Sequence, residues 1–318
     1  MSDSSLRIGI TGASGYIAGK LICELQESAA ADMILATDIR SPSVEYSSKV
    51  KFAHWDVSEN RPDIFARHQV DTLIHLAYVL NPARQDARAR LVNVAGTENA
   101  LQASEQAGVR HVIYLSSTSV YGAHADNPEL LNETDPVRPL EGFQYSRDKV
   151  AAESLVSEFA SRNPEIAVTI LRVCPVMGPN ADNFIAKAFR KPLLPGIGSA
   201  DPPMQFLHED DIVQTLIRCL ERRPRGIYNV GGDGAIRWGE MVAMMNRPVV
   251  RLPAPIWYLL TSAAWHLRLQ SDSPASGLDF VRYRWTASTD KIRSAIGIEF
   301  RYSSRAAWES YTWSENSR

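Results

Sequence analysis

Short apolar runs alternate with longer segments of helical periodicity in the first half of the chain, and this alternation restricts the fold more than any other feature. The apolar runs do not alternate polar with apolar residues, as expected of strands buried on both faces. The intervening segments, at residues 15–29, 86–107 and 144–162, suit helical crossovers between parallel strands. The runs are LRIGIT, MILATD, VKFAHWD, DTLIHLA, RHVIYLSS and AVTILRV. We therefore predict an α/β fold with a Rossmann-type, doubly wound parallel sheet.

The alternation of strand-like and helix-like segments ends after Arg172. Residues 173–205 are rich in Pro and Gly, which indicates loops with one short helix. Residues 206–231 resemble a return to the sheet layer, and the remainder is mainly of helical pattern. We therefore predict a nucleotide-binding domain of residues 1–172 together with 206–231. Residues 173–205 and 232–318 are expected to form a smaller, mostly helical substrate-binding domain.

Composition excludes several classes of partner for this chain of 318 residues. Its net charge of −2 gives no basic surface for nucleic acid, so a small molecule is the expected partner. The N-terminus MSDSS lacks the pattern of a secretion signal, and three scattered cysteines suit a reducing compartment. We predict a cytoplasmic protein.

The most apolar stretch is LPAPIWYLLTSAAWHLRL, at residues 252–269. Its continuous apolar part is shorter than the roughly 20 residues that a transmembrane helix needs, so no transmembrane segment is predicted. Three interpretations stay open: a packed helix of the smaller domain, an apolar wall or lid over a substrate, or an interfacial helix.

A glycine-rich turn follows the first predicted strand, with Gly12, Gly15 and Ala18 in TGASGYIAG. Glycines at a strand-to-helix turn allow a pyrophosphate to approach the helix N-terminus, and alanine is tolerated at the third position. The second strand ends in ATDIR, where Asp38 can accept hydrogen bonds from the adenosine ribose and favours NAD. Arg40 could pair with a 2′-phosphate, so NADP remains possible.

Tyr145 and Lys149 stand four residues apart in GFQYSRDKVAAE, where a helix is predicted to begin. Residues at this spacing lie on one face of a helix, so the ammonium can stand beside the phenol. Such a pair is also common on ordinary helix surfaces, and its interpretation depends on the other motifs.

Taken in order, the motifs resemble the extended short-chain dehydrogenases/reductases, also described as the NAD-dependent epimerase/dehydratase family, and within it a branch named after UDP-glucose 4-epimerase. The resemblance extends to about Gly232. It rests on TGASGYIAG, WDV, HLAY, NVAGTENAL, YLSSTSVYG, the YSRDK pair, LRVCPVMGP and FLHEDD. It implies a cofactor site of Gly12, Ser14, Gly15, Tyr16, Ile17, Asp38, Arg40, Asp56, Val57, Leu76, Ala77, Tyr78, Asn93, Tyr145 and Lys149. It also implies Ser117, Tyr145 and Lys149 as catalytic residues, and a homodimer joined through the helices at 86–107 and 144–162.

The residue chemistry agrees with this resemblance. Interconverting a secondary alcohol and a ketone moves a hydride and a proton, and nicotinamide carries only the hydride. A phenol has a pKa of about 10, which the positive charges of Lys149 and the nicotinamide ring can lower. Ser117, at a strand end that faces the cofactor crevice, can donate a hydrogen bond to the substrate oxygen. Thr118 and Ser119 are alternatives for that donor.

HEDD, at residues 208–211, superficially resembles a metal cluster. Adjacent residues point in different directions, and acidic residues before a helical pattern commonly satisfy helix-start amides. We therefore predict no metal site.

Three reactions compete. A sugar-nucleotide dehydratase is disfavoured because Thr118 and Ser119 stand where acidic residues are usual. Sugar-nucleotide epimerases commonly carry an Asn and an Arg where this chain has Pro175 and Met204, and a diphosphate would want such a charged contact. We therefore favour an NAD(P)-dependent oxidoreductase acting on a less charged alcohol or ketone. The alternatives are a UDP-glucose 4-epimerase-like enzyme with tightly held NAD and a non-enzymatic NAD(P)-sensing protein.

Overall fold

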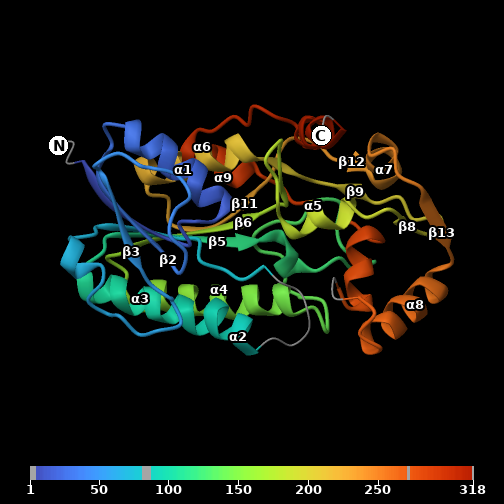
Figure 1. The fold of residues 1–318 in the computed structure, drawn as a ribbon, viewed down its shortest axis with the longest axis horizontal. Helices are drawn as coiled ribbons and strands as arrows, with labels where there is room; N and C mark the ends of the chain where they lie inside the picture. Colours follow the sequence, from blue (N-terminus) through green and yellow to red (C-terminus); the bar gives the residue numbers. More distant parts are fainter. Residues whose placement is uncertain (1–4, 81–86, 271–272, 317–318) are drawn as a thin grey trace.

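A seven-stranded parallel sheet occupies the centre of the computed structural model, which describes residues 5–80, 87–270 and 273–316 (Figure 1). Its strand order is β11-β6-β5-β4-β1-β2-β3, and every neighbouring pair is parallel. The order reverses between β1 and β4, which confirms the predicted doubly wound, Rossmann-type sheet. The strands are β1 (Leu6–Thr11), β2 (Ala31–Asp38), β3 (Val50–His54), β4 (Thr72–His75), β5 (His111–Ser117), β6 (Ala167–Val173) and β11 (Gly226–Val230).

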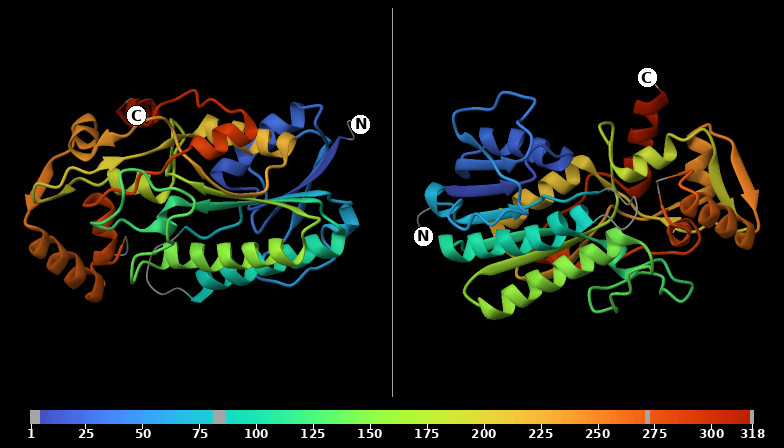
Figure 2. Two further views of the ribbon diagram at one scale, coloured as in Figure 1. Left: turned by 180° about the vertical axis from the view of Figure 1, so that it is seen from behind. Right: turned by 60° about the horizontal axis from the view of Figure 1, so that its bottom comes forward.

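Helices cover both faces of this sheet, as Figures 1 and 2 show. One layer contains α1 (Tyr16–Glu27), α6 (Glu209–Arg222) and α9 (Asp290–Ile296); the other contains α2 (Ala87–Arg90), α3 (Gly96–Ala107) and α4 (Gln144–Arg162). A π-helical turn, η2 (Leu91–Ala95), joins α2 to α3. Asp86, where the second helix was predicted to begin, lies outside the described residues. Because both faces are covered, β6 is buried along its whole length, which explains the missing polar alternation.

Two apolar cores flank the sheet. Ile8, Leu21 and Ile212 belong to the core under α1 and α6. Leu73 and Val156 belong to the core under α3 and α4, on the opposite face. The sheet is therefore fixed from both sides, and the edge formed by the strand ends is held in place.

A smaller part built from later segments lies beyond the carboxyl ends of the strands, at the right of Figure 1. Its own core includes Phe206, Trp238 and Trp308. Its elements are β7 (Val176–Met177), α5 (Phe184–Phe189), β8 (Leu194–Ile197), β9 (Pro203–Met204), β10 (Leu207–His208), β12 (Ile236–Arg237), α7 (Trp238–Met244), β13 (Val249–Leu252), α8 (Ala254–His266), η4 (Ala275–Val281) and α10 (Ser304–Asn316). Two further 3-10 segments, η1 (Ala66–His68) and η3 (Thr118–Tyr121), belong to the first half.

The division into two domains stays a prediction, and α9 departs from it in packing. Ile292 and Ile296 of α9 enter the core that α1 and α6 share with the sheet, although α9 falls within residues 232–318. Sequence analysis did not separate α9 from its neighbours, because the order of residues along the chain does not say which core a helix enters.

Candidate active site

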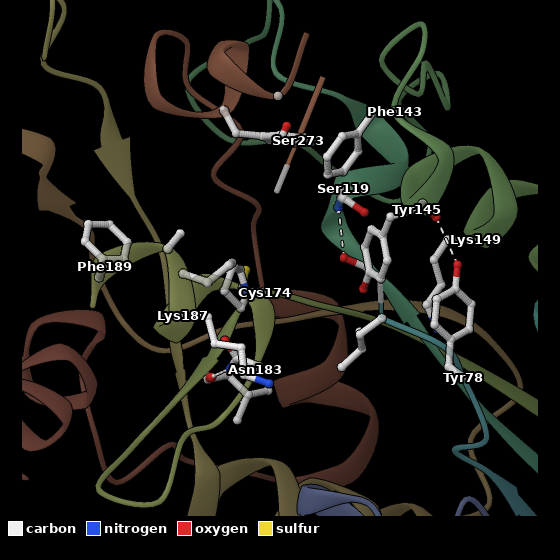
Figure 3. Close-up of a pocket in the computed structure, with 18 of the residues that line it drawn as sticks. Tyr78, Ser119, Phe143, Tyr145, Lys149, Cys174, Asn183, Lys187, Phe189 and Ser273 are labelled. Carbon is white, nitrogen blue, oxygen red and sulfur yellow. Dashed lines mark hydrogen bonds between the residues drawn. The ribbon is translucent and has the colours of Figure 1, made fainter. Parts of the chain in front are cut away.

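A cavity of about 960 Å³ lies where the carboxyl edge of the sheet meets the smaller part. The sheet contributes residues that follow β1 and β4 and the last residues of β5, and α4 contributes Tyr145 and Lys149. In Figure 3, Tyr145 and Lys149 rise on one side of the cavity, and Cys174, Asn183, Lys187 and Phe189 lie on the other. The motifs of the first half therefore converge on one cavity with a wall from the second half.

Gly12 fixes the cofactor side of this cavity. Its φ is +69°, and a Cβ there would lie 2.7 Å from the backbone nitrogen and Cα of Ala77. The ends of β1 and β4 approach each other this closely because the Thr11 hydroxyl accepts hydrogen bonds from the amides of Leu76 and Ala77, both at 3.2 Å. A side chain at Gly12 would push these two strand ends apart.

The N-terminus of α1 points into the same space. Its N-cap is Gly15, with no side chain capping the first-turn amides and no acidic residue in the first turn. Unsatisfied amides at a helix N-terminus favour an anion, so a pyrophosphate fits here. Among the predicted cofactor residues, those that line the cavity are Gly12, Ser14, Gly15, Tyr16, Ile17, Arg40, Leu76, Ala77, Tyr78, Tyr145 and Lys149.

Asp38 ties the glycine-rich turn to the end of β2. Its carboxylate accepts hydrogen bonds from the backbone amides of Ser14 (3.0 Å) and Arg40 (2.9 Å). The Ser14 hydroxyl donates to the carbonyl of Arg40 at 2.7 Å. The Asp38 side chain is largely buried, whereas that of Arg40 is 69% exposed. A hydrogen bond between Asp38 and the ribose stays a prediction. The contacts seen here show that the Asp38 carboxylate also holds the glycine-rich turn in place.

Besides Asp38, three predicted cofactor residues lie outside the cavity lining. The Asn93 side chain accepts a hydrogen bond from the Val79 amide (2.7 Å) and donates one to the Val79 carbonyl (3.3 Å), which holds the segment after β4. Asp56 accepts hydrogen bonds from the amide and hydroxyl of Ser58. Val57 is buried against Gly96. Direct cofactor contacts by these residues stay a prediction.

The phenol of Tyr16 donates a hydrogen bond to Glu209. Glu209 is buried, and it also pairs with Lys20 at 2.6 Å and accepts a hydrogen bond from the Asn180 side chain at 2.7 Å. Burial opposes its ionisation, but the hydrogen bonds from Lys20, Tyr16 and Asn180 prevail and lower the pKa of Glu209. This cluster joins α1 to α6, and sequence analysis missed it.

The acidic residues of HEDD do not cap α6 as predicted. The imidazole of His208 is the N-cap group, accepting a hydrogen bond from the Asp210 amide at 3.2 Å. Asp211 instead accepts hydrogen bonds from the amides of Arg301 and Tyr302. Among the residues that the structure describes, no group of three or more His, Cys, Asp or Glu side chains is arranged to hold a metal ion.

Ser117 and Tyr145 both line the cavity, and the Ser117 hydroxyl is close enough to the phenol to affect the pKa of Tyr145. Ser117 ends β5 and Tyr145 is the second residue of α4, so each stands where a regular element begins or ends. Burial raises the pKa of Tyr145, and the Ser117 hydroxyl acts in the opposite direction. Of the three hydroxyl residues considered from the sequence, Ser117, Thr118 and Ser119, Ser117 is the one that acts on the pKa of the phenol, and its catalytic role stays a prediction.

Lys149 lies one helical turn after Tyr145 and is buried. Its Nζ donates a hydrogen bond to the Leu115 carbonyl at 2.7 Å and lies 3.7 Å from the ring centroid of Tyr78. The Tyr78 hydroxyl donates to the Tyr145 carbonyl at 3.0 Å, so Tyr78 braces the start of α4. Burial lowers the pKa of Lys149 to about 7, while the charge of Glu153 acts to raise it. The ammonium is thus held near the phenol by an aromatic face and a carbonyl.

A buried ion pair lies behind these residues. The guanidinium of Arg172 pairs with Glu153 at 2.5 Å, and the Ser116 hydroxyl donates to the same carboxylate at 2.6 Å. Arg172 also donates to the Tyr121 hydroxyl at 2.7 Å. Glu153 follows Lys149 by one further helical turn, a spacing visible in the sequence that could have suggested its place.

The opposite wall of the cavity is mainly apolar. It is made by Cys174, Pro175, Val176, Ile185, Phe189, Leu193, Leu194, Met204, Trp238, Trp257, Leu260, Ala264, Leu278, Phe280, Val281 and Trp285. Asn183 also lines it, but its side chain is engaged in capping α5 through the Ala186 amide at 2.9 Å. The hydroxyl of Ser119 is buried beside Ser117 with no hydrogen-bond partner within the described part of the chain.

Comparison with known proteins agrees with this geometry. Residues 8–231 match the model of the NAD dependent epimerase/dehydratase family. The chain belongs to this family. It is therefore an enzyme of the extended short-chain dehydrogenase/reductase type that uses NAD, as predicted. The family match ends close to Gly232, where the predicted resemblance also ends.

Individual relatives are more distant. An uncharacterised protein of Mycobacterium tuberculosis is 27% identical over 312 residues, which cover 95% of this chain and 82% of the relative. UDP-glucuronic acid decarboxylase 2 of Arabidopsis thaliana is 25% identical over 264 residues, covering 78% of this chain and 58% of the relative. The structure of MoeE5 in complex with UDP-glucuronic acid and NAD superposes with a TM-score of 0.76 at 25% identity, covering 98% of this chain and 99% of MoeE5. The UDP-glucuronic acid 4-epimerase of Bacillus cereus, at 18% identity and a TM-score of 0.74, shares the fold over 98% of this chain and 99% of the epimerase.

Proposed function

We propose that the protein is an NAD(P)-dependent oxidoreductase that transfers hydride between nicotinamide and a secondary alcohol or ketone carbon, with Tyr145 as the acid/base. The observation that carries the proposal is that Ser117, the half-buried Tyr145 and the buried Lys149 line one cavity, with Lys149 one helical turn after Tyr145. These groups share one cavity with the uncapped N-terminus of α1. The proposed acid/base residue, the hydroxyl donor and the helix N-terminus that suits a pyrophosphate therefore lie in one cavity.

The protein residues supply the proton side of the reaction. Ser117 donates a hydrogen bond to the substrate oxygen, and the Tyr145 phenol gives or takes the proton at that same oxygen. When bound, NAD supplies the hydride acceptor, and its positive ring favours phenolate. When protonated, Lys149 adds a second positive charge, which also favours phenolate. The mainly apolar wall excludes water and strengthens these interactions.

A substrate of low charge is favoured on the side of the cavity that faces Tyr145. Pro175 and Met204 line the cavity where related epimerases commonly carry Asn and Arg. Neither side chain can pair with a diphosphate. The surrounding aromatic and aliphatic side chains favour an uncharged or amphipathic alcohol or ketone.

A UDP-sugar epimerase with tightly held NAD is the second candidate, and one observation favours it. MoeE5, which matches 98% of this chain at 25% identity, has been crystallised with UDP-glucuronic acid and NAD. Lys187 also lines the cavity and could contact a phosphate. Its nearest acidic partner is Asp182, at 3.5 Å across an exposed ion pair that solvent weakens.

Cofactor retention and net redox change distinguish the two candidates. The purified protein is denatured to release any retained NAD(H), and its turnover is followed with secondary alcohols, ketones and UDP-sugars. An oxidoreductase exchanges its cofactor and accumulates or consumes NADH. Formation of a sugar epimer without net NADH change would replace the first proposal by the second, and NAD binding without turnover on any substrate would reject both in favour of a sensor.

We also propose a homodimer in which α2, α3 and α4 pair with the same helices of a second copy. Leu91, in the turn between α2 and α3, is half exposed on this layer, which suits a helix-to-helix contact. The molar mass from light scattering tests the proposal, and a monomer at micromolar concentration would reject it. The cytoplasmic location stays a prediction.

A further inference from the structure

The helix α8 is apolar on nearly every side and yet has no buried residue. Ile256, Leu259, Leu260 and Leu267 all belong to the exposed large hydrophobic residues, and Leu259 and Leu267 are each 69% exposed. A helix that is hydrophobic all round is ordinarily enclosed by protein or lipid. Figures 1 and 2 show α8 at the end of the molecule opposite the N-terminus, with η4 and β8 as its packing neighbours.

Two adjacent apolar faces divide this helix. Trp257, Leu260, Thr261 and Ala264 line the cavity. Ile256, Leu259, Ala263 and Leu267 follow the helical spacing of a neighbouring face, which is exposed and does not line the cavity. The outer face continues past the helix end to Leu269, which is 76% exposed. One helix is thus both a wall of the active site and an uncovered apolar surface.

Every charged side chain within residues 241–270, the segment that contains α8, is basic; an acid of η4, Asp279, accepts a hydrogen bond from Tyr258 on the helix. Residues 241–270 contain no Asp or Glu, although the whole chain has 36 of them. Arg247 and Arg251 precede the helix and Arg268 follows it; all three are exposed. Within residues 5–80, 87–270 and 273–316, none of the three forms an ion pair. Exposed leucines flanked by arginines are the combination that binds an anionic lipid surface.

Other exposed apolar side chains lie at the rim of the same cavity. Leu80 and Leu193 both line the cavity and are about half exposed, as is Leu260 of α8. The apolar surface therefore continues from the outer face of α8 into the mouth of the active site. A molecule held in the leaflet that faces the protein could enter this mouth without crossing water.

We propose that α8 docks the enzyme on an anionic membrane surface, lying in the plane of the headgroups with Leu259, Leu267 and Leu269 inserted. The helix does not cross the bilayer, since no helix in the described part of the chain is long and apolar enough to do so. The docking places the cavity mouth at the membrane, so the substrate is an amphipathic alcohol or ketone that partitions into lipid. That second statement rests on the proposed function, whereas the docking does not.

Vesicle binding of the full chain tests the docking. The protein is centrifuged with vesicles of phosphatidylcholine alone and of an equal mixture of phosphatidylcholine and phosphatidylglycerol. It is expected to bind the mixed vesicles, and raising the salt concentration weakens that binding because it screens the arginines. Absence of binding to the mixed vesicles at low salt overturns the proposal.

Variants separate the outer face of α8 from other exposed apolar residues. Leu259→Glu and Leu267→Glu should each weaken vesicle binding about tenfold or more, since each removes an inserted side chain and adds a repelled charge. Arg268→Gln should weaken binding to the mixed vesicles alone. Leu130→Glu, at a residue 48% exposed outside α8, is the matched control and should bind as the unmodified protein does. Equal loss with Leu130→Glu, or no loss with either α8 variant, overturns the assignment.

Two further readouts separate failure of the docking from failure of the proposed function. Leu259 and Leu267 do not line the cavity, so their variants should keep full turnover on a short, water-soluble secondary alcohol that the unmodified protein oxidises. Tyr145→Phe should lose turnover and keep vesicle binding. If light scattering shows instead that α8 joins two copies and that Leu267→Glu separates them, a second copy covers the helix and the membrane proposal is overturned.

Discussion

The nucleotide side and the substrate side of the cavity differ in what fixes their shape. On the nucleotide side, the contacts involve the backbone: Gly12 lies against the backbone of Ala77, and the Asp38 carboxylate accepts hydrogen bonds from two main-chain amides. On the substrate side, the wall consists of side chains from short elements such as α5, and α8 has no buried residue. Backbone contacts leave little room for substitution, whereas a wall of side chains can change without disturbing the sheet. The two sides are therefore expected to respond differently to substitution, the first through backbone strain and the second through the shape of the cavity.

The family match covers the nucleotide side and part of the wall. It includes residues 8–231, and with them α5 and β8, and leaves out the segment that contains α8 and η4. Tyr145 lies on α4, a helix of the sheet layer, and lines the cavity between the two sides. Five changes test the difference between the sides, beginning with the one expected to have the greatest effect.

Tyr145→Phe should abolish most of the chemistry while leaving the nucleotide side intact. The variant keeps the ring but loses the acid/base hydroxyl, which typically contributes about 10² to 10⁴ in rate. Turnover is measured with a reactive alcohol or ketone, and NAD affinity by calorimetric titration. A fully active variant would show that another group moves the proton. A parallel loss of NAD affinity would show that the phenol belongs to the cofactor cradle.

Gly12→Ala should damage the nucleotide side through the backbone. The added Cβ would lie 2.7 Å from Ala77 in a left-handed conformation. The conformation alone costs about 1–2 kcal/mol, so we expect unfolding free energy to fall by roughly 2 kcal/mol or more, with NAD affinity lost in parallel. Gly19→Ala is the matched control: nothing lies within 4 Å of its Cβ, and a helical Gly→Ala change gains about 0.5–1 kcal/mol. Denaturant titration measures both, and equal stability of the two variants would contradict the close approach.

Acid should destabilise the sheet through its buried histidines. Burial first, and nearby positive charges second, lower the pKa of His75 and of His111 to about 3. Between about pH 3 and 6.5 the unfolded chain therefore binds more protons than the folded one. The free energy of unfolding rises with pH across this range, so the folded state loses stability as the pH falls. Each histidine contributes a slope of up to about 1.4 kcal/mol per pH unit. His111→Gln should remove the contribution of one proton from that slope. An unchanged slope would mean that His111 is not a neutral, buried imidazole in the folded protein.

Trp257→Ala should alter the substrate side alone. Trp257 lines the cavity and donates a hydrogen bond from its indole to the Gly196 carbonyl at 2.9 Å. Removing it enlarges the cavity and should raise KM by about tenfold, because a buried aromatic contact is lost. NAD affinity should not change. Leu259→Ala, on the outer face of the same helix, should leave KM as it is; a rise in KM for both variants would point to a general loosening of α8.

Asp38→Ala should produce the smallest change, a shift of cofactor preference toward NADP by several-fold to about tenfold, since it removes a carboxylate that repels a 2′-phosphate. Arg40→Ala should shift the preference in the opposite direction. The ratio of kcat/KM with NADPH and NADH measures both. Unchanged preference in Asp38→Ala would show that this carboxylate serves only to hold the turn through Ser14 and Arg40.

The nucleotide half could be predicted because its rules are local. The strand-to-helix turn at Gly12 and the pair Tyr145 and Lys149 depend on spacing within a few residues. The helix at residues 144–162 is found with the same bounds as α4. The supporting contacts could not be predicted in the same way. Asn93 reaches Val79 through a π-helical turn, whose geometry no residue spacing announces.

The alternation of strands and helices, the NAD cofactor and the spacing of Tyr145 and Lys149 could be inferred from the sequence alone, because burial on both faces and helical periodicity leave their pattern along the chain. Which side chains meet across long separations became visible only in the folded chain. The tertiary structure joined Tyr16 to Glu209, placed α9 under the sheet, and left α8 uncovered beside the cavity. Apolar spacing says that a helix has a face to bury, but the path of the whole chain decides whether protein covers that face.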